Sequence, residues 1–196
     1  MRVLILGAGG HGRAVCEAAR DAGFDVAGFL DGRAPLPDVL GLPVLGPEAA
    51  HDGAPLLIAL GDNAMRLAAA GRLGAVLPVL LHPSAIRARS AELAEGAVVM
   101  PRVVLGAQAR VGRLALVNTR AIVEHDVELG EGVHIAPGAI LCGGVRIAAR
   151  AMVGAGAVIA PNIQVGEGAI IGAGASVLQK VDAFSRVAGV PARRLL

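Results

Sequence analysis

The sequence predicts a half-Rossmann-like α/β domain over residues 1–82, a parallel β-helix over residues 83–182 and a C-terminal cap over residues 183–196. Two patterns predict this fold: strand-like and helix-like segments alternate in the first half, and an aliphatic residue recurs every sixth position in the second. Composition agrees with them, because 55% of the chain is hydrophobic while only 2% is aromatic. A core filled by Val, Ile, Leu and Ala suits a narrow, repetitive interior.

The alternation in the first half implies a parallel sheet with helices packed on it. Strand signals stand at RVLIL (2–6), DVAGFLD (25–31) and PLLIALGD (55–62), and helix signals at RAVCEAARDAG (13–23) and NAMRLAAAGRLG (63–74). The segment VLPVLLHP (76–83) then leads into the repeat.

A glycine-rich turn joins the first strand to the first helix. Gly7, Gly9 and Gly12 fit G-x-G-x-x-G, and Asp31 ends the next strand. Such glycines let a diphosphate approach the backbone at a helix N-terminus, and the acidic residue can accept a ribose hydroxyl. The motif alone points to a dinucleotide such as NAD. The domain is only about half of a full dinucleotide fold, so a single nucleotide diphosphate fits better. A tight turn without a ligand is the alternative, and His11 inside it is either a ligand contact or an exposed polar residue.

The second half repeats with a period of six. An aliphatic residue occupies every sixth position from Leu93 to Val177, and a small or apolar residue stands two positions before each later one. This pattern specifies a parallel β-helix in which the aliphatic residue points inward, glycine helps the chain to turn and the small residue fits near a corner. Three sides make one coil of eighteen residues, so residues 93–182 give about five coils. A β-sandwich with chance periodicity is the alternative.

Charge and cysteine content narrow the class of protein. The formal net charge of +2 provides no field for nucleic acid or an anionic membrane. No apolar run reaches the ~18 residues of a membrane helix, and the start lacks the features of a signal peptide. Cys16 and Cys142 lie far apart without metal-type spacing. We therefore expect a cytoplasmic protein with reduced cysteines and no metal.

The stretch AIVEHDVELGEGVHIAPGAI (121–140) carries two histidines, His125 and His134, together with Asp126 and three glutamates. A neutral histidine can remove a proton near pH 7, and a neighbouring carboxylate can fix its tautomer, although adjacent strand residues normally point in opposite directions. From the residues alone, the favoured interpretation is that His125 is an exposed turn residue and His134 a surface residue with satisfied hydrogen bonds. His51 is expected in a loop, and His82 is expected in a structural role at the domain junction.

The motifs GAGGHGRAV, GFLDGR, ALGDNAMR, HPSA, NTRAIVEHDVELGEGVHIAPGAIL and AGVPARR follow one another along nearly the whole chain. In this order they resemble the bacterial hexapeptide-repeat sugar acetyltransferases of the sialic-acid O-acetyltransferase type, which include the UDP-4-amino-sugar N-acetyltransferases. The resemblance implies left-handed coils and a homotrimer with acetyl-CoA between adjacent β-helices. The GVPAR segment is similar to the tail of this family.

The resemblance also implies roles for individual residues. His125 matches the catalytic base and Asp126 the acidic residue that accompanies it. His134 matches a contact to the acetyl-CoA thioester region, and Gly143 matches a glycine whose backbone faces the pantetheine arm. Asn118 matches a position near the sugar.

In the first domain, the resemblance implies that five residues hold the nucleotide: Gly9, His11, Gly12, Asp31 and Arg33. Gly32 stands where the family often has an acidic or polar residue, which leaves the nucleotide contacts open. Cys142 is expected to be structural, so acetyl transfer is expected to be direct, without an acyl-enzyme.

Three functions stay open at this level. The first is an acetyl-CoA-dependent N-acetyltransferase acting on a nucleotide-linked, UDP-4-amino deoxysugar. The second is an O-acetyltransferase acting on a sialic-acid-like sugar, and the third is a non-catalytic trimeric nucleotide-binding scaffold. His125 and His134 stand nine residues apart, which is half a coil. They can therefore share a site only across a corner of one prism or between neighbouring subunits.

Overall fold

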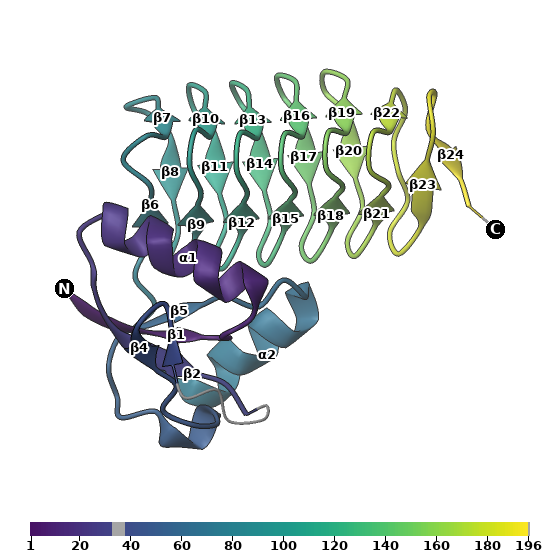
Figure 1. The fold of residues 1–196 in the computed structure, drawn as a ribbon. Coiled ribbons are helices and arrows are strands. Elements are labelled where there is room, and N and C mark those ends of the chain that lie inside the picture. Colours follow the sequence, from purple (N-terminus) through teal and green to yellow (C-terminus); the bar gives the residue numbers. More distant parts are fainter. Residues whose placement is uncertain (33–37, 196) are drawn as a thin grey trace.

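A computed structural model describes residues 1–32 and 38–195 of the chain. The N-terminal domain has a three-stranded parallel sheet in the order β2 (Asp25–Leu30), β1 (Arg2–Leu6), β5 (Leu56–Ile58). Helices α1 (Gly10–Asp21) and α2 (Asn63–Leu73) pack against it (Figure 1). The remaining elements are a short hairpin of β3 (Asp38–Val39) and β4 (Leu42–Pro43), and a 3₁₀ turn, η1 (Glu48–Ala50). The predicted alternation is confirmed, with α1 beginning at Gly10 rather than at residue 13.

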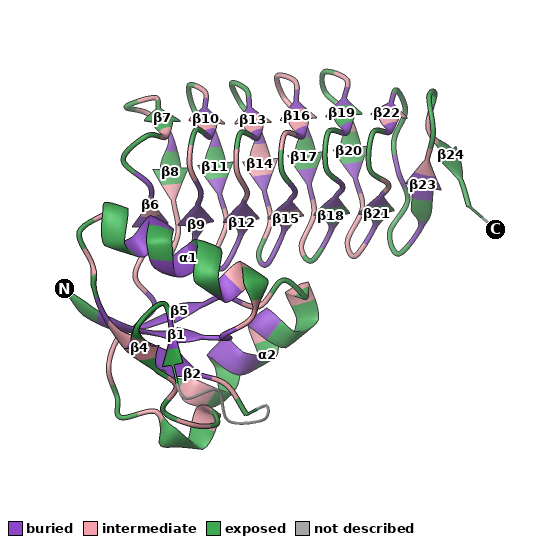
Figure 2. Cartoon of the chain, in the orientation of Figure 1, coloured by how far each residue is buried: buried purple, intermediate pink, exposed green. Residues whose placement is uncertain are grey.

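The sheet of this domain is buried along most of its length (Figure 2). In α1 the buried side chains Val15, Cys16 and Ala19 recur at helical spacing and cover one side of the sheet, where Phe29 is also fully buried. One βαβαβ-like unit with three strands is what a single mononucleotide half-fold provides.

The second half forms a left-handed parallel β-helix of about six turns, whose short strands stack into three sheets (Figure 1). We call these sheets the docked, aliphatic and charged faces. The docked face contains β6 (Leu80–Leu81), β9 (Val98–Val99), β12 (Leu116–Val117), β15 (His134–Ile135), β18 (Met152–Val153), β21 (Ile170–Ile171), β23 (Arg186–Ala188) and β24 (Arg193–Arg194). The aliphatic face contains β7 (Ile86–Arg87), β10 (Val104–Leu105), β13 (Ile122–Val123), β16 (Ile140–Leu141), β19 (Val158–Ile159) and β22 (Ser176–Val177). The charged face contains β8 (Glu92–Leu93), β11 (Arg110–Val111), β14 (Glu128–Leu129), β17 (Arg146–Ile147) and β20 (Gln164–Val165).

The hexapeptide prediction is confirmed in its main features. Val117, Val123 and Ile135 of the aliphatic series are fully buried inside the prism, and so is the small residue Ala121. Strands pair in parallel with each residue beside the residue eighteen positions later, as in Ile122 beside Ile140. The stacking begins with β6, ahead of the expected start at residue 83, and the chain ends with an antiparallel β23–β24 pair.

The prediction that the glycines after the aliphatic residues help the chain to turn is wrong. The glycines that follow the aliphatic positions do not have positive φ. Instead, a Cβ on Gly106 would lie 2.6 Å from the main-chain nitrogen of His125, and a Cβ on Gly130 would lie 2.6 Å from the main-chain nitrogen of Ala149. They are small because successive coils approach closely there. Positive φ recurs three residues after each aliphatic residue of the series from Leu93 to Ile171, and non-glycine residues such as Leu114 and Asp126 also take it.

The three faces have different outer surfaces. The docked face is covered at its start by the N-terminal domain, since Leu80, Val98 and Leu116 belong to the same buried cluster as α1. The aliphatic face presents a ladder of β-branched side chains, and the charged face presents alternating acidic and basic ones. The β-branched series consists of Ile86, Val104, Ile122, Ile140 and Val158. The charged series consists of Glu92, Arg110, Glu128 and Arg146. The ion pairs of the charged face are exposed, at 3.6–4.0 Å, and contribute little to stability.

Candidate active site

His125 and Asp126 form a pair in the turn between β13 and β14, at the corner between the aliphatic and charged faces. The His125 Nδ1 lies 2.8 Å from Asp126 Oδ2, and both side chains are 64% exposed. The concern that neighbouring strand residues point apart does not apply, because Asp126 lies in a turn with φ of 59°. A carboxylate on Nδ1 favours the tautomer that carries its proton there, which leaves Nε2 free to accept a proton.

Gly143 lies directly beneath the His125 imidazole, one coil further along. A Cβ at residue 143 would lie 2.5 Å from both Cε1 and Nε2 of the ring. The absent side chain therefore makes room for the imidazole, in addition to any contact that the Gly143 backbone makes with a ligand. The main chain supports the same arrangement, since the Gly144 N–H donates to the His125 carbonyl at 3.0 Å.

His134 lies in different surroundings, at the start of β15 on the docked face. Its half-buried ring has Nε2 3.5 Å from the Asn118 amide nitrogen, and within the described residues Nδ1 has no hydrogen-bond partner. Burial, followed by the nearby charges of Arg66 and His11, lowers the pKa of His134 to about 4, while the Gly61 main chain acts in the opposite direction. The Gly61 main chain favours the protonated ring, but Nδ1 forms no hydrogen bond of normal geometry among the described residues. We therefore regard burial as the dominant influence on the pKa of His134. His134 is neutral at pH 7.

His11 belongs to the same cluster, at the first turn of α1. Its ring is half-buried, and burial together with the charge of Arg66 lowers its pKa. The structure thus brings together three residues that sequence reasoning assigned to separate ligands: His11 for the nucleotide, His134 for acetyl-CoA and Asn118 for the sugar. Together they line the junction between the two domains.

The two site histidines do not meet within one chain. His125 lies in the turn that enters β14, whereas His134 follows the turn that leaves it, so a whole side of the prism separates them. Within residues 1–32 and 38–195, no hydrogen bond joins the His125 pair to the His134 cluster. The His125 pair and the His134 cluster therefore lie at two separate places on each chain.

The glycine-rich turn has the predicted geometry, with a modified role for Asp31. Gly7 has φ of 102°, and a Cβ on Gly12 would collide with the Gly7 carbonyl, so α1 packs tightly on the turn. Gly9 precedes α1 with nothing within 4 Å of a Cβ position. One carboxylate oxygen of Asp31 accepts a hydrogen bond from the Ala8 N–H at 2.9 Å, so Asp31 supports the turn itself. Arg33 lies outside the described residues.

The remaining histidines have structural contacts. His82 lies 3.0 Å from the Asp21 carboxylate through Nε2, and its Nδ1 accepts from the Ser84 N–H at 3.0 Å, which ties α1 to the first coil. His51 contacts the Ala54 carbonyl within a loop. Cys142 is a half-buried free thiol.

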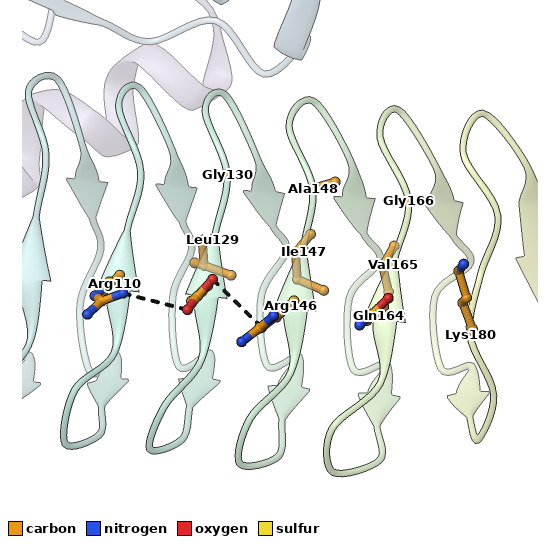
Figure 3. A pocket seen from close by; sticks show the side chains of 11 residues that line it. Arg110, Leu129, Gly130, Arg146, Ile147, Ala148, Gln164, Val165, Gly166 and Lys180 are labelled. Atoms are coloured by element: carbon orange, nitrogen blue, oxygen red, sulfur yellow. Dashed lines mark ion pairs between the residues drawn. The ribbon is translucent and has the colours of Figure 1, made fainter.

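A long groove runs along the charged face, where it is lined by β14, β17 and β20 and by the residues that follow them (Figure 3). It has a volume of about 530 Å³, with small residues at its base and basic side chains along it; these are Gly130, Ala148, Gly166 and Arg110, Arg146, Lys180. Glu128 forms ion pairs with both arginines, at 3.6 and 3.8 Å. A neighbouring polar hollow of about 460 Å³ shares this wall and reaches Asp126 and Gly144. An elongated ligand with anionic groups would fit beside the His125–Asp126 pair.

Sequence reasoning missed two residues of α2, Asn63 and Arg66. Arg66 is only 2% exposed, contacts carbonyls of the β-helix and lies close enough to His134 and His11 to lower the pKa of both. Helical periodicity contained the signal, because Arg66 stands three and four residues before the buried Ala69 and Ala70. The described residues contain no group of three potential metal ligands, and none of their helices has the length and hydropathy of a membrane span.

Comparison with known proteins defines the class. Residues 2–73 match the model of the PglD N-terminal domain, and residues 144–179 match that of the bacterial transferase hexapeptide repeat. The acetyltransferase domain of PglB from Neisseria gonorrhoeae, solved with acetyl coenzyme A, is 37% identical with a TM-score of 0.94, covering 99% of this chain and 98% of that one.

Two further solved structures agree. PerB from Caulobacter crescentus, in complex with CoA and GDP-perosamine, is 36% identical over 100% of this chain and 98% of its own, with a TM-score of 0.95. WeeI from Acinetobacter baumannii is 26% identical over the full length of both chains, with a TM-score of 0.91. The chain belongs to the family of hexapeptide-repeat sugar acetyltransferases that carry a PglD-type N-terminal domain.

The contact between Gly143 and the His125 ring yields a prediction. We expect Gly143→Ala to displace the imidazole and to lower kcat for acetyl transfer by about 100-fold, because a misplacement of about 1 Å is that costly. Steady-state kinetics, with circular dichroism as a check on folding, measure the effect. Gly71→Ala in α2 is the control, since a Cβ there meets nothing within 4 Å. Equal kinetics for the two variants would contradict this role of Gly143.

Proposed function

We propose that the protein transfers the acetyl group of acetyl-CoA to the amino group of a nucleotide-linked deoxysugar, with a UDP-4-amino sugar as the expected substrate. The observation that carries the proposal is the His125–Asp126 pair at 2.8 Å, with its ring exposed above Gly143. Among the histidines that the structure describes, His125 alone has a carboxylate hydrogen-bonded to one ring nitrogen while the other nitrogen stays accessible. The complexes of PglB with acetyl coenzyme A and of PerB with CoA and GDP-perosamine support the two substrate classes.

The chemistry follows from the orientation of the imidazole. The substrate amine attacks the thioester carbonyl, and His125 Nε2 removes a proton from the nitrogen as the C–N bond forms. Asp126 stabilises the resulting imidazolium through Nδ1–H. When the tetrahedral intermediate collapses, the C–S bond breaks and the imidazolium returns the proton to the departing CoA sulfur. Transfer is direct, since no acyl-enzyme is needed for this balance.

His134 has a complementary part in the proposal. Because its ring is neutral at pH 7, it can donate one hydrogen bond and accept another without introducing a charge. We assign it to the thioester region of acetyl-CoA and Asn118, its neighbour, to the sugar. The backbone of Gly143 is assigned to the pantetheine arm. His11, Gly9, Gly12, Asp31 and Arg33 are assigned to the nucleotide.

A homotrimer completes the site in this proposal. The aliphatic face presents hydrophobic side chains from Ile86 to Val158, which are 67% and 39% exposed, respectively, while those between them are partly exposed. A continuous apolar surface of this kind marks an interface. It borders the corner that carries His125, so a neighbouring copy that covers it also approaches His125. We propose that each active site combines His125 of one subunit with the His134 cluster of the next.

The acceptor is assigned as an amine rather than a hydroxyl. PerB is described as an N-acetyltransferase, and this chain is 36% identical to it over 98% of its length. A sialic-acid-like hydroxyl acceptor uses the same base, so substrate tests distinguish the two. The nucleotide is the other variable, because PerB was solved with a GDP-linked sugar whereas the expected substrate here is UDP-linked.

Removing the base tests the role of His125. We expect His125→Ala to lower kcat by about 10²–10⁴-fold, the usual contribution of a general base, while acetyl-CoA binding measured by calorimetry persists. His51→Ala is the matched control, because that ring only contacts a loop carbonyl. Near-normal turnover in His125→Ala would refute the assignment of the base.

Mixed subunits test whether the site lies between copies. If each site uses His125 of one subunit and His134 of the next, trimers reassembled from equal amounts of His125→Ala and His134→Ala chains regain about a quarter of their sites by random mixing in a closed ring. Activity of the mixture is compared with each variant alone. A site built within one chain would gain nothing from mixing.

A panel of nucleotide sugars tests the substrate. We expect a UDP-linked 4-amino sugar to raise Tm and to be acetylated on nitrogen, as seen by mass spectrometry, because binding to the folded state stabilises it. GDP-linked 4-amino sugars and CMP-linked sialic acids are compared in parallel. O-acetylation of the CMP compounds alone would support the alternative acceptor, and binding without turnover of any sugar would support a scaffold.

A further inference from the structure

Arg66 is a buried cation bound almost entirely by main-chain carbonyls. Its Nε donates to the Leu114 carbonyl at 2.9 Å, and Nη1 donates to the Leu60 carbonyl at 2.9 Å. Its Nη2 donates to the Asn63 side-chain oxygen at 2.8 Å, the Gly132 carbonyl at 2.9 Å and the Val133 carbonyl at 3.4 Å. All three guanidinium nitrogens are therefore engaged, and two of them reach the β-helix.

The contacts of α2 follow the eighteen-residue repeat. Arg66 bonds the carbonyls of Leu114 and Gly132, and Asn63 Nδ2 donates to the Arg150 carbonyl at 2.9 Å. These three carbonyl residues occupy the same corner of three successive coils and share positive φ values of 54–62°. The first turn of α2 thus lies along a column of equivalent carbonyls at the corner between the charged and docked faces.

That column leads directly to His134. The Gly132 and Val133 carbonyls belong to the two residues before it. Asn63 Nδ2 also donates to the Ala151 carbonyl at 3.1 Å, which is the same oxygen that accepts the His134 N–H at 3.0 Å. Helix α2 therefore holds both the two residues before His134 and the Ala151 carbonyl that accepts the His134 N–H.

Packing adds to these hydrogen bonds. Leu67 of α2 fits against Gly132, where a Cβ would lie 2.7 Å from the leucine side chain. A larger residue at position 132 would push α2 away from the coil. Polar and apolar contacts of the same helix therefore converge on one short segment, residues 132–134.

The charge of Arg66 is not balanced by a direct ion pair among the described residues. Its ionic environment contains one carboxylate, Asp62, which acts without a direct ion pair among the described contacts. Burial lowers the pKa of Arg66 to about 10, so the guanidinium stays protonated at pH 7. Burying a charge is costly unless it is hydrogen-bonded, and here the main-chain carbonyls provide those bonds. The carbonyls that Arg66 holds include those of the two residues before His134.

We propose that Arg66, together with Asn63, is a positioning residue for His134, holding segment 132–134 against α2 so that the nucleotide-binding domain and the acetyl-transfer half-site keep one fixed relation. The role of His134 as a ligand contact rests on the proposed function; the coupling itself does not. Arg66 touches no ligand in this account and acts through the main chain that carries His134.

The electrostatics of the cluster agree with this geometry. The charged or titratable groups that face His134 are Arg66 from α2 and His11 from α1, while Asn118 on the adjacent strand is neutral. Both Arg66 and His11 lower the pKa of His134, in addition to burial. Arg66, which holds residues 132–134 in place, thus adds to burial in keeping the His134 ring neutral.

Three variants separate position from charge. Arg66→Lys keeps the charge but cannot span all of the carbonyls, and Arg66→Met removes the charge. Asn63→Ala removes the bonds to residues 150 and 151 and one of the three acceptors of Arg66 Nη2. Arg72→Met is the matched control, since Arg72 lies on the same helix but is exposed and pairs with Glu48. The readouts are kcat/KM for acetyl transfer and the pKa of His134 from NMR of labelled histidine, assigned with His134→Asn.

We expect kcat/KM to fall by about 10- to 100-fold in Arg66→Lys, Arg66→Met and Asn63→Ala, because small displacements of a ligand contact are costly. The pKa of His134 is expected to rise toward 6.5 in Arg66→Met, to stay low in Arg66→Lys and to shift less in Asn63→Ala. Arg72→Met is expected to stay within about twofold of the wild type, as surface changes usually do.

The proposal is overturned if the folded variants keep kcat/KM within about twofold, or if activity falls while the His134 resonance and its titration do not change. If Arg66→Met does not fold, Arg66→Lys and Asn63→Ala decide the question. If the wild type acetylates no nucleotide sugar, the proposed function fails, but the His134 titrations still test the coupling.

Discussion

The parallel stacking of eighteen-residue coils is the constraint on which the rest of this structure depends. Because each residue lies beside the one eighteen positions later, a site in this fold is built from columns rather than from neighbours in sequence. The His125 ring needs the space above Gly143, and α2 needs the aligned carbonyls of residues 114, 132 and 150. Both requirements repeat at the period of the coil. Chemistry is therefore added to the outside of a prism whose aliphatic interior stays regular.

Docking of the N-terminal domain then makes the three equivalent faces of the prism different. Apolar contacts from α1 cover the first coils of the docked face, while α2 inserts a guanidinium into the carbonyl column at its edge. Such carbonyls are available because the positive-φ residues 114, 132 and 150 pair with the preceding coil through their N–H groups, while their carbonyls accept no main-chain hydrogen bond among the described residues. A repeat that forms an ordinary turn elsewhere becomes a binding surface for a helix. The half-buried histidines of both domains meet at that surface.

Sequence reasoning reached the fold because the fold depends on a periodic signal, the six-residue aliphatic series. It reached the His125–Asp126 pair through the resemblance of a motif of adjacent residues to a known family. It assigned the wrong cause to glycines such as Gly106, because close approach between coils involves residues nearly a coil apart. It could not place His11 beside His134, since that proximity comes from domain docking and leaves no spacing in the chain. Arg66 was accessible in part: its helical position predicts burial, but its carbonyl partners depend on the register of three coils.

The two site histidines have opposite surroundings, and this difference fits two different roles. His125 is exposed and contacts a carboxylate, which stabilises the imidazolium that a base must become. His134 is half-buried near a guanidinium and a second imidazole, which disfavour its protonation. In an acid–base reaction one group gains and loses a proton. The reaction is favoured when the groups around it keep a constant charge. Within one chain these environments occupy opposite edges of the charged face, so a shared reaction requires a second copy to bring an exposed corner to a buried junction. Assembly and catalysis would then depend on the same surface.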